Sequence, residues 1–594
     1  MDTIKLNIDG REVQTKNGTT VLQAALEGGI YIPHLCYHPD LTAVGVCRLC
    51  IVEIEGKEGL PPSCMTPVAG GMVVKTKTPQ IDQMRLLAME LMLSRHPADC
   101  STCGQYLNCE LQSVKQYLGT SEELSVRRRQ KPFATNTGNP LFVHDFVRCI
   151  LCGRCVRACH DLRGVEVLSF IDKGKDIHVG TAFDRLLADA GCRFCGACVE
   201  VCPTGALRDK EELTKGKSRR AARVPCKYAC PVEIDVPRYV RLIAEGKFDE
   251  AYAVVREQLP LPSVCSYICL SYCEEECRRG VVNEPMGIRE LKRFVSERHS
   301  GLWKEHLMPP RSTGKRVAIL GSGPAGLTAA YYLARKGHEV TIFEQAPLAG
   351  GMLRQAISRK RLPKEALEDD IHEIIQAGVN VNLNAGHVRI SRLLEQDKFD
   401  AVLLAIGSTF VGPSVYWLKE EGIDLSAQGS VRVDAYNMST SKEGVFACGD
   451  GVLDAISEDF IRNAKSDDYS EDFFELLIDR FVSNRGDSFR SATRAIASSK
   501  KAAEAVDQYL GGDGDLTESF LPPEEDQSQY LGRQEGFASL ARCAPRFESP
   551  VPQYAGLSRA EPSLDEDDAT NEAKRCLKCD LRLKIKPIRF WGDY

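Results

Sequence analysis

The chemistry of this sequence is concentrated in its cysteines. Its 594 residues include 25 of them, too few for a disulfide scaffold but mostly grouped in short runs. Residues 1–13 alternate apolar and polar side chains and lack the pattern of a signal peptide, so we expect a cytoplasmic protein. In a reducing compartment, grouped cysteines are more often metal ligands than disulfides, because thiolates bind soft metals. The spacing within each group then indicates the metal.

The first group has one cysteine before a CxxC loop and one far after it. Zinc sites usually pair two close-set cysteine hooks, so this layout favours a 2Fe–2S cluster over zinc. The candidate ligands are Cys36, Cys47, Cys50 and Cys64. Alternating apolar residues from Ile4 to Ile8 predict a strand, and Thr19 or Thr20 is a candidate helix start. These elements fit a ferredoxin-like domain.

A histidine precedes the second group by one helical turn. A lone histidine is usually structural, but this one stands at ligand spacing from three cysteines: His96, Cys100, Cys103 and Cys109. The pattern HPxDCxxCxxxxxC resembles the N-terminal part of the iron–sulfur subunit of respiratory complex I and of the iron-only hydrogenases. The resemblance implies that His96 is the fourth ligand of a 4Fe–4S cluster, where a neutral imidazole removes one negative charge and tends to raise the reduction potential.

Two further runs repeat the spacing C-x2-C-x2-C-x3-C of bacterial two-cluster ferredoxins, in which the fourth cysteine of each run binds the other cluster. One predicted set is therefore Cys149, Cys152, Cys155 and Cys202, and the other is Cys192, Cys195, Cys198 and Cys159. With these runs, residues 1–210 resemble the electron-input module of complex I and hydrogenases. Three arginines lie near or within the first run and predict a docking face for ferredoxin: Arg148, Arg154 and Arg157.

Downstream, CKxxCP-type and CxxxCxxxC spacing resembles the small subunit of glutamate synthase and the NADPH-binding subunit of bifurcating transhydrogenases. In that family a helical double-cluster domain, which begins with a CLxC pair, precedes an FAD domain. Residues 215–225 lack the pair, but the C-terminus contains one. We expect it to fold back and complete two 4Fe–4S sets, Cys226, Cys265, Cys576 and Cys579, and Cys230, Cys269, Cys273 and Cys277. The alternative is a separate zinc hook at Cys576 and Cys579.

Two cysteines stay outside these groups. We expect Cys448 to be a small core residue, because it lies in an apolar run before a Gly-Asp pair. Cys543 stands in a polar stretch and is assigned no role.

A dinucleotide fingerprint follows, in which a buried strand at 317–320 ends in GxGxxG and a second strand ends at an acid. The glycines admit a pyrophosphate to a helix N-terminus, and the acid takes the ribose hydroxyls. The continuation resembles the glutathione-reductase-like family, which implies FAD, a ribityl contact from Asp450 and a helix at 492–505 that points its N-terminus at the flavin. The candidate FAD residues are Gly321, Gly323, Pro324, Ala325, Gly326, Glu344, Gly350, Gly351, Met352, Gly407, Gly449 and Asp450.

Family members insert a second nucleotide-binding unit within this domain. Here only 36 residues, 409–444, are available for it, and they contain no second glycine fingerprint. A βαβ unit needs about 30 residues and a whole domain about 100, so we expect the NAD(P)H domain to be missing. An acidic insertion at 452–489 has apolar residues at helical spacing, which fit a solvated surface helix, a partner-docking element or a lid over the flavin. These residues are Phe473, Phe474, Leu476, Leu477 and Phe481.

Composition excludes other function classes. Acidic residues number 82 and basic residues 76, for a formal net charge of −6, so there is no basic footprint for nucleic acid or for a membrane surface. The longest apolar stretch, 317–334, is interrupted by glycines and a proline, so we expect no membrane span. No nucleophile or paired carboxylates stand out, and no catalytic residue is assigned.

We therefore predict a multidomain chain with α/β and α+β parts, which carries one 2Fe–2S cluster, five 4Fe–4S clusters and FAD. Residues 121–140 and 511–530 are the expected connectors. The predicted units are a ferredoxin-like 2Fe–2S β-grasp domain (1–80), a 4Fe–4S segment with one histidine and three cysteines (81–120), a two-cluster bacterial ferredoxin domain (140–210), a helical double-cluster domain (220–305, completed by 570–585), a Rossmann-like FAD domain (314–512, with the insertion 452–489) and a C-terminal extension with CxxC (513–594).

The predicted function is electron relay within a larger anaerobic, NADH- and ferredoxin-dependent oxidoreductase. The resemblance implies partners like the complex I NADH-binding flavoprotein and its small 2Fe–2S subunit, together with ferredoxin and a hydrogenase, formate dehydrogenase or other reductase subunit. It leaves open whether such a complex bifurcates electrons. Two alternatives also stay open: an NADPH-oxidising transhydrogenase subunit that uses its own FAD, and a non-catalytic scaffold with a vestigial flavin site.

Overall fold

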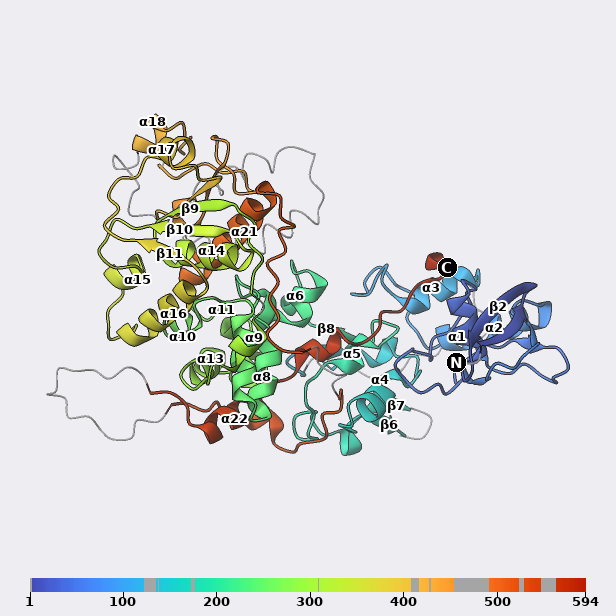
Figure 1. Ribbon diagram of the computed structural model, residues 1–594. Coiled ribbons are helices and arrows are strands. Elements are labelled where there is room, and N and C mark those ends of the chain that lie inside the picture. Colours follow the sequence, from blue (N-terminus) through green and yellow to red (C-terminus); the bar gives the residue numbers. More distant parts are fainter. Residues whose placement is uncertain are drawn as a thin grey trace.

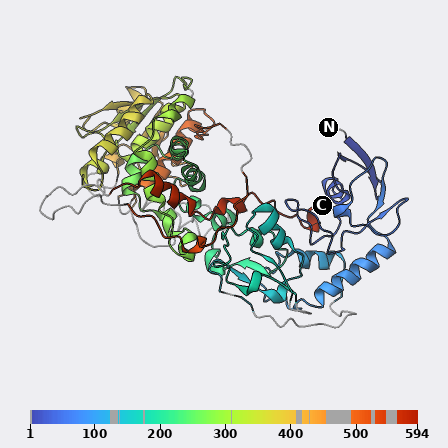
Figure 2. The same ribbon diagram turned by 90° about the horizontal axis from the view of Figure 1, so that it is seen from below.

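The computed structural model describes residues 3–121, 135–136, 138–172, 177–307, 309–407, 416–426, 429–452, 491–522, 528–545 and 562–594. The molecule is elongated, with the N-terminal domain at one end and a parallel sheet at the other (Figure 1). The C-terminus returns to the N-terminal end of the molecule (Figures 1 and 2). The apolar residues of the predicted insertion lie outside the described residues. Across the described ranges, no helix is both long and apolar enough to cross a membrane.

The N-terminal domain is a four-stranded mixed sheet in the order β2-β1-β4-β3, with one helix packed on it. Thr20 caps that helix as predicted, since its hydroxyl accepts from the Gln23 amide and the Gln23 side chain accepts from the Thr20 amide. Two longer helices follow the sheet. The elements are β1 Thr3–Ile8, β2 Arg11–Lys16, α1 Val21–Glu27, β3 Glu53–Ile54, β4 Val73–Lys75, α2 Pro79–Leu93 and α3 Glu110–Tyr117.

The next domain repeats one short motif twice. Each cysteine run contains a helix whose N-terminal flank is a glycine with positive φ, Gly153 at 72° and Gly196 at 70°. Such a backbone conformation favours glycine because other residues carry a Cβ that clashes there. Two antiparallel strand pairs, β5 with β8 and β6 with β7, flank the runs. The elements are β5 Phe142–His144, α4 Arg154–Arg157, β6 Ser169–Ile171, β7 His178–Gly180, α5 Ala197–Glu200 and β8 Leu207–Asp209.

The third domain is helical, and the C-terminal part of the chain completes it. Helix α22, Glu566–Lys574, packs on α8 and α13, and its Ala569 and Ala573 join the same apolar core. The predicted return of the C-terminus to this domain is therefore seen. The other helices are α6 Arg219–Arg223, α7 Pro225–Tyr228, α8 Val236–Ala244, α9 Phe248–Arg256, α10 Pro262–Ile268, α11 Tyr272–Glu275, α12 Arg279–Val282 and α13 Ile288–Ser296.

The fourth domain is a five-stranded parallel sheet in the order β11-β10-β9-β12-β13. Strand β9 lies at the centre of this sheet and is buried from Val317 to Leu320. Glu344 directly follows β10, which is the position that the fingerprint predicts for the acid. Between β12 and β13, the described residues form α18 and irregular loops. The strands are β9 Arg316–Leu320, β10 Glu339–Phe343, β11 Asn380–Asn382, β12 Ala401–Leu404 and β13 Val445–Ala447. The helices are α14 Pro324–Arg335, α15 Met352–Gln355, α16 Lys364–Gln376, α17 Ile390–Glu395, α18 Tyr416–Glu420 and α21 Ala492–Tyr509.

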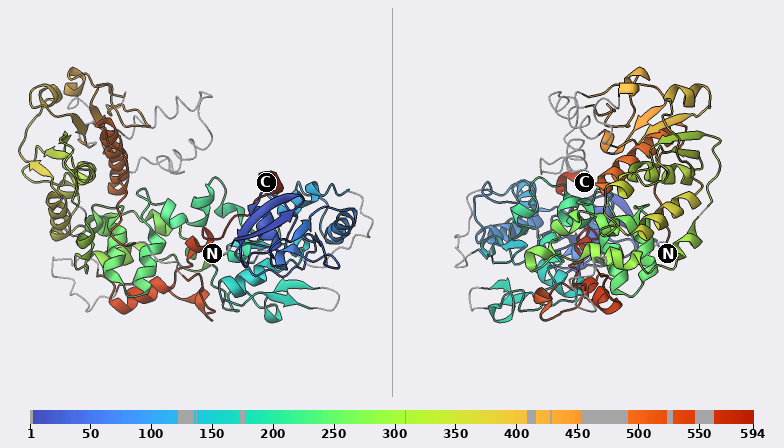
Figure 3. Two further views of the ribbon diagram at one scale, coloured as in Figure 1. Left: turned by 45° about the vertical axis from the view of Figure 1, so that its right-hand side comes forward. Right: turned by 90° about the vertical axis from the view of Figure 1, so that its left-hand side faces the viewer.

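Residues 528–545 and 562–594, which we call the C-terminal segment, run back across three domains to the N-terminal end (Figure 3). The Leu531 amide donates to the Arg163 carbonyl at 2.8 Å in the two-cluster domain. The Lys586 amide donates to the Asp40 carboxylate at 2.7 Å in the N-terminal domain. The ring of Tyr594 lies 5.5 Å from that of Tyr31. The segment therefore contacts every domain that lies N-terminal to the parallel sheet.

Candidate functional site

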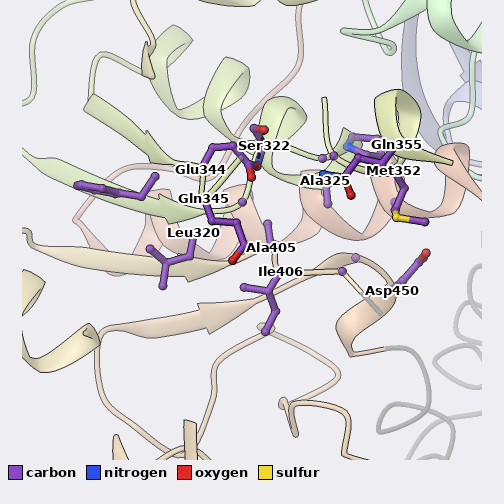
Figure 4. A pocket seen from close by; sticks show the side chains of 18 of the residues that line it. Leu320, Ser322, Ala325, Glu344, Gln345, Met352, Gln355, Ala405, Ile406 and Asp450 are labelled. Atoms are coloured by element: carbon purple, nitrogen blue, oxygen red, sulfur yellow. Dashed lines mark hydrogen bonds between the residues drawn. The ribbon is translucent and has the colours of Figure 1, made fainter. Parts of the chain in front are cut away.

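A cavity of about 300 Å³ opens at the carboxyl edge of the parallel sheet, where GxGxxG meets the N-terminus of α14. Figure 4 shows Ser322 and Glu344 together at one end of it, and Met352 and Asp450 at the other. Ten of the twelve predicted FAD residues line this cavity. They are Gly321, Gly323, Pro324, Ala325, Glu344, Gly351, Met352, Gly407, Gly449 and Asp450.

The glycines of the fingerprint have different physical roles. A Cβ on Gly321, where φ is 107°, would stand 2.5 Å from the Ala405 carbonyl oxygen, and one on Gly326 would stand 1.9 Å from the Gly321 oxygen. These two glycines permit close packing of strand and helix. A Cβ on Gly323 meets no atom within 4 Å, so this position borders open space where a phosphate could approach the helix N-terminus.

Glu344 and its neighbours form a buried polar cluster at one end of the cavity. Its carboxylate accepts hydrogen bonds from the Ser322 amide at 2.9 Å, the Ser322 hydroxyl at 2.5 Å and the Ala346 amide at 2.8 Å. The Gly350 amide donates to the Ser322 hydroxyl at 3.1 Å. Gly350 thus supports this cluster without lining the cavity.

The far end of the cavity is formed by the turn at 449–451 and by helix α21. Ser491 caps the helix, Ala495 lines the cavity, and the Ser498 hydroxyl accepts from the Gly449 amide at 3.1 Å. The helix predicted at 492–505 is therefore present beside the cavity. Residues that the fingerprint does not indicate also line it, from loops and from helices α15 and α18: Gln345, Gln355, His387, Val388 and Trp417.

The four cysteines of the N-terminal domain are all buried. The Cys36 thiol lies within hydrogen-bonding reach of Cys47, and the Cys64 thiol within reach of Cys50. These contacts hold the pKa of Cys47 and Cys50 below the ordinary thiol value and that of Cys36 and Cys64 above it. Two thiol pairs on one loop system match the donor set that a 2Fe–2S cluster needs.

The His96 group converges only in part on one cavity. His96, Cys100 and Cys109 line a small cavity, whereas the Cys103 sulfur lies against Gly205, where a Cβ would stand 2.4 Å from it. The His96 Nδ1 donates to the Pro97 carbonyl at 3.0 Å. In a neutral ring, that bond fixes the tautomer that presents the Nε2 lone pair to a metal.

The two ferredoxin runs come together as their spacing predicts. Cys149, Cys152, Cys155 and Cys202 line one small cavity. Cys192, Cys195, Cys198 and Cys159 are electrostatic neighbours of one another. Burial raises the pKa of Cys155 and Cys198 well above the ordinary value, so ionised thiolates at these positions need a compensating cation such as iron.

Backbone amides donate to several of these sulfurs from two residues downstream. The donors are Leu151 to Cys149 at 3.4 Å, Phe194 to Cys192 at 3.3 Å, Ser271 to Cys269 at 3.4 Å and Lys578 to Cys576 at 3.4 Å. All four donor residues have a positive φ, between 52° and 58°, and amide–sulfur bonds of this kind tune the potential of iron–sulfur clusters. In the described ranges, no three His, Cys, Asp or Glu side chains are close enough to hold a single metal ion.

In the helical domain, the thiols group differently from the predicted sets. The thiol neighbours of Cys226 are Cys277, Cys579, Cys576 and Cys273, in order of decreasing influence. Cys265 instead lies with Cys269 and Cys230, beside the buried ammonium of Lys292. Burial opposes the charge of Lys292, but the surrounding thiols raise its pKa. Cys277 thus lies near the C-terminal pair of cysteines and Cys265 near Cys230 and Cys269, because α10 packs on α13 whereas Cys277 follows α11.

The three arginines that predict a ferredoxin-docking face are turned inward. The Arg154 side chain is fully buried and forms a bidentate pair with Glu110 at 2.7 and 2.8 Å. Arg148 pairs with Asp145 at 3.1 Å, and Arg157 donates to backbone carbonyls. Their charges thus have partners within the chain, and ferredoxin docking at these residues stays a prediction.

Of the two remaining cysteines, Cys448 is buried and Cys543 is partly buried. Cys448 is buried after β13, and burial alone raises its pKa to about 12, as expected of a core residue. The Cys543 amide donates to the Glu572 carboxylate of α22 at 2.8 Å, which places this residue at the helical core.

Comparison with known protein families matches five successive parts of the chain. The matching models are a 2Fe-2S iron-sulfur cluster binding domain (residues 1–79), an NADH-ubiquinone oxidoreductase-G iron-sulfur binding region (85–123), an NADH-quinone oxidoreductase subunit 3 ferredoxin-like domain (139–208), a dihydropyrimidine dehydrogenase domain II with a 4Fe-4S cluster (210–301), and a pyridine nucleotide-disulphide oxidoreductase model (298–467).

Curated relatives match about a third of this chain. A G-type NADH-quinone oxidoreductase subunit of Rhizobium meliloti is 41% identical over 34% of this chain and 24% of its own length. NADP-reducing hydrogenase subunit HndD of Solidesulfovibrio fructosivorans is 38% identical over 36% of this chain and 37% of its own. The NADP(+)-dependent formate dehydrogenase subunit beta of Moorella thermoacetica is 39% identical over 31% of this chain and 29% of its own.

The chain thus spans between about a quarter and two fifths of the length of these relatives. All three are subunits of NAD(P)H-linked oxidoreductases. The chain joins segments that match iron–sulfur models, similar to parts of these relatives, to a segment that matches a pyridine nucleotide-disulphide oxidoreductase model.

Proposed function

We propose that this chain relays electrons between a redox partner at its N-terminal end and a flavin in the cavity of the parallel sheet. The observation that carries the proposal is the spatial order of the candidate sites. Figure 1 shows the N-terminal domain, the two-cluster domain, the helical domain and the parallel sheet in that order along the molecule. Each of the first three domains contains groups of buried or partly buried thiols, and the C-terminal segment adds Cys576 and Cys579 beside Cys226. A series of ligand groups along the molecule is what a one-electron relay requires.

The proposed cofactors are one 2Fe–2S cluster, five 4Fe–4S clusters and FAD. The ligands are those predicted from the sequence, with one change in the helical domain. There the proposed sets are Cys226, Cys277, Cys576 and Cys579 for one cluster, and Cys230, Cys265, Cys269 and Cys273 for the other. The proposed domain bounds stay 1–80, 81–120, 140–210, 220–305 with 570–585, 314–512 and 513–594.

The residues of the chain fit these groups chemically. The buried thiols, the amide donors to sulfur and the inward Nε2 of His96 match iron–sulfur clusters. Gly323 leaves room for a pyrophosphate, and the Glu344 carboxylate lies where ribose hydroxyls would reach it. When bound, a flavin exchanges electron pairs with nucleotides and single electrons with clusters. Lys292 offsets the negative charge of the thiolates around it.

The proposed partners follow from the relatives. A complex I-like NADH-binding flavoprotein and a small 2Fe–2S subunit would dock near the N-terminal domain, with ferredoxin or a hydrogenase, formate dehydrogenase or other reductase subunit as a further redox partner. The alternative that the chain itself oxidises NADPH is favoured by the match of residues 298–467 to a pyridine nucleotide-disulphide oxidoreductase. The length of 409–444 argues against a nucleotide domain of the usual size.

An anaerobic titration of the reconstituted chain with NADH and then NADPH separates these functions. The relay proposal expects dithionite to bleach the flavin while neither nucleotide does. Stoichiometric bleaching by NADPH would contradict it and support the transhydrogenase alternative. A flavin that binds without any redox response would support the scaffold alternative.

A further inference from the structure

One guanidinium group connects two of the candidate cluster loops. The Nη2 of Arg157 donates to the Cys36 carbonyl at 2.6 Å and to the Cys152 carbonyl at 3.3 Å, and its Nη1 donates to the Thr42 carbonyl. Cys36 belongs to the candidate 2Fe–2S group, and Cys152 belongs to the first set of the two-cluster domain. A single nitrogen therefore bridges the backbone of one candidate ligand from each of two domains.

Arg157 differs from an ordinary surface arginine in its position, its burial and its hydrogen bonds. Arg157 ends helix α4, the helix that Gly153 allows to start directly after Cys152. Its side chain is half-buried, and burial lowers its pKa while the Cys152 and Cys36 thiols act in the opposite direction. Desolvating a guanidinium group is costly unless its donors are used. Here the planar fork uses donors toward both domains, which an ammonium group cannot reproduce.

A second arginine of the same run makes a matching connection. Arg154 pairs with Glu110, which directly follows Cys109 of the His96 group, and donates to the Val201 carbonyl at 3.4 Å, which directly precedes Cys202. The helix between Cys152 and Cys159 thus directs one arginine toward each neighbouring candidate cluster. Two buried or half-buried cations are therefore committed to contacts between ligand loops.

We propose that Arg157 is a positioning residue that holds the Cys36 loop against the Cys152 loop and so fixes the separation of the two clusters there. The inference rests on the proposed function, because it concerns the first step of the relay within this chain. The rate of electron tunnelling falls steeply with the distance between two clusters. Rapid transfer therefore requires that the two loops stay packed in one relative position. The carbonyl–guanidinium–carbonyl bridge also gives a hydrogen-bonded path between the two ligand backbones.

The test compares R157Q, R157K and R48Q in the full-length holoprotein. Arg48 is the matched control, because it lies exposed on the same loop between Cys47 and Cys50. Amide hydrogen exchange is measured over residues 36–47 and 149–159. The rate at which the 2Fe–2S signal and the neighbouring cluster signal equilibrate is followed by freeze-quench EPR, and iron content verifies that the clusters remain.

R157Q should raise amide exchange in both loops and slow equilibration about tenfold, the factor by which loss of one charge-assisted hydrogen bond shifts a docking equilibrium. R157K, which keeps the cation, should show a smaller change, and R48Q should match the wild type. Equal exchange and equal rates in R157Q and R48Q would overturn the proposal. Should R157Q lose iron, the comparison of R157K with R48Q decides.

The same measurements distinguish failure of the proposed function. A wild-type chain whose two signals never equilibrate, or which lacks them, would contradict the relay. The exchange data would still decide whether Arg157 docks the two loops, because they require no electron transfer.

Discussion

The two halves of the molecule build their candidate cluster sites in different ways. In residues 3–210, each set of ligands comes from a single domain, and the two ferredoxin runs exchange their fourth cysteines, Cys159 and Cys202. In the helical domain, Cys226 and Cys277 meet Cys576 and Cys579 from the far end of the chain. Where the ligands of a cluster lie close in the sequence, their spacing is sufficient to predict which cysteines belong together. In the second half, cysteines from the two ends of the chain come together only in the folded protein.

The joint between the halves is also built differently from either half. Arg582, three residues after Cys579, is buried and donates to Glu200 and Asp209 of the two-cluster domain at 2.8 to 3.1 Å. Glu200 itself lies between Cys198 and Cys202. The C-terminal segment therefore both brings two thiols to the helical domain and holds that domain against the first half.

Removing the thiols of Cys576 and Cys579 should have the largest effect. We expect the double variant C576S/C579S to lose the iron of one 4Fe–4S cluster, because two of four ligands vanish. C277S should remove the same EPR signal, whereas C265S should affect the other cluster of the helical domain. Iron analysis and EPR check this result. Loss of the same signal in C265S and C576S would restore the partition expected from the sequence, and unchanged iron in the double variant would contradict the return of the C-terminus.

The buried joint should have the next largest effect. R582Q removes a buried cation that Glu200 and Asp209 share, while Arg223 stays paired with Glu200 and Arg278 with Asp209. We expect it to reduce the local stability of residues 196–210 by about 1.5–3 kcal/mol, the usual contribution of hydrogen bonds to a charged group. Amide hydrogen exchange measures that local free energy. K586Q is the control, because the Lys586 side chain that pairs with Asp40 is exposed. An R582Q change no larger than that of K586Q would show that the joint does not hold the halves together.

The same joint should depend on pH in a defined direction. Burial opposes the ionisation of Asp209, but Arg582 lowers its pKa to about 2. A pKa below the unfolded value of about 3.9 stabilises the folded state at all pH values above that value. The difference between wild type and R582Q should therefore be constant at neutral pH and shrink as pH falls from about 4 to about 2. A difference that grows in acid would contradict the assignment.

Adding one methyl group at Gly323 should weaken FAD binding without affecting the clusters. G323A places a Cβ in open space at the expected pyrophosphate position, and the steric cost of about 1–3 kcal/mol should weaken FAD binding about tenfold or more. The iron content should not change. Fluorescence titration with FAD measures the affinity. G70A, at an exposed glycine with equally open space, is the control, and equal FAD affinity in the two variants would move the pyrophosphate elsewhere.

Removing one helix cap in each half should have the smallest effects on stability. Thr20 caps α1 in the first half and Ser491 caps α21 in the second. We expect T20A and S491A each to cost about 1 kcal/mol, but in different parts of the molecule. Hydrogen exchange should show the loss only around α1 in T20A and only around α21 in S491A. Loss of protection across both halves in either variant would mean that the halves unfold as one unit.

Much of the architecture could be predicted because its signals are local. The Thr20 cap, the strand before GxGxxG and the repeated cysteine spacing each depend on neighbours within a few residues. The cavity residues His387 and Trp417 could not be predicted, because they reach the site from a loop and from helix α18, whose positions depend on tertiary packing.

The differences from the expected arrangement share one physical cause, which is tertiary packing. Four cysteines at equal spacing, Cys265 to Cys277, do not reveal which of them faces α13 and which faces the C-terminal segment. Arg154 and Arg157 have the sequence context of exposed cations, but Glu110 and the Cys36 loop, far away in the sequence, bury them. Long-range partners of this kind leave no periodic signal.

We propose that electrons cross the joint between the halves. Stopped-flow mixing with a reduced ferredoxin tests this transfer most directly. This reductant is itself a protein and is too large to enter the flavin cavity. In the wild-type holoprotein, the account predicts that cluster bleaching is followed by flavin bleaching, whereas in C576S/C579S the clusters of the first half bleach and the flavin lags far behind. Flavin reduction at the same rate in both proteins would show that electrons reach the flavin without passing the joint, and would contradict the account.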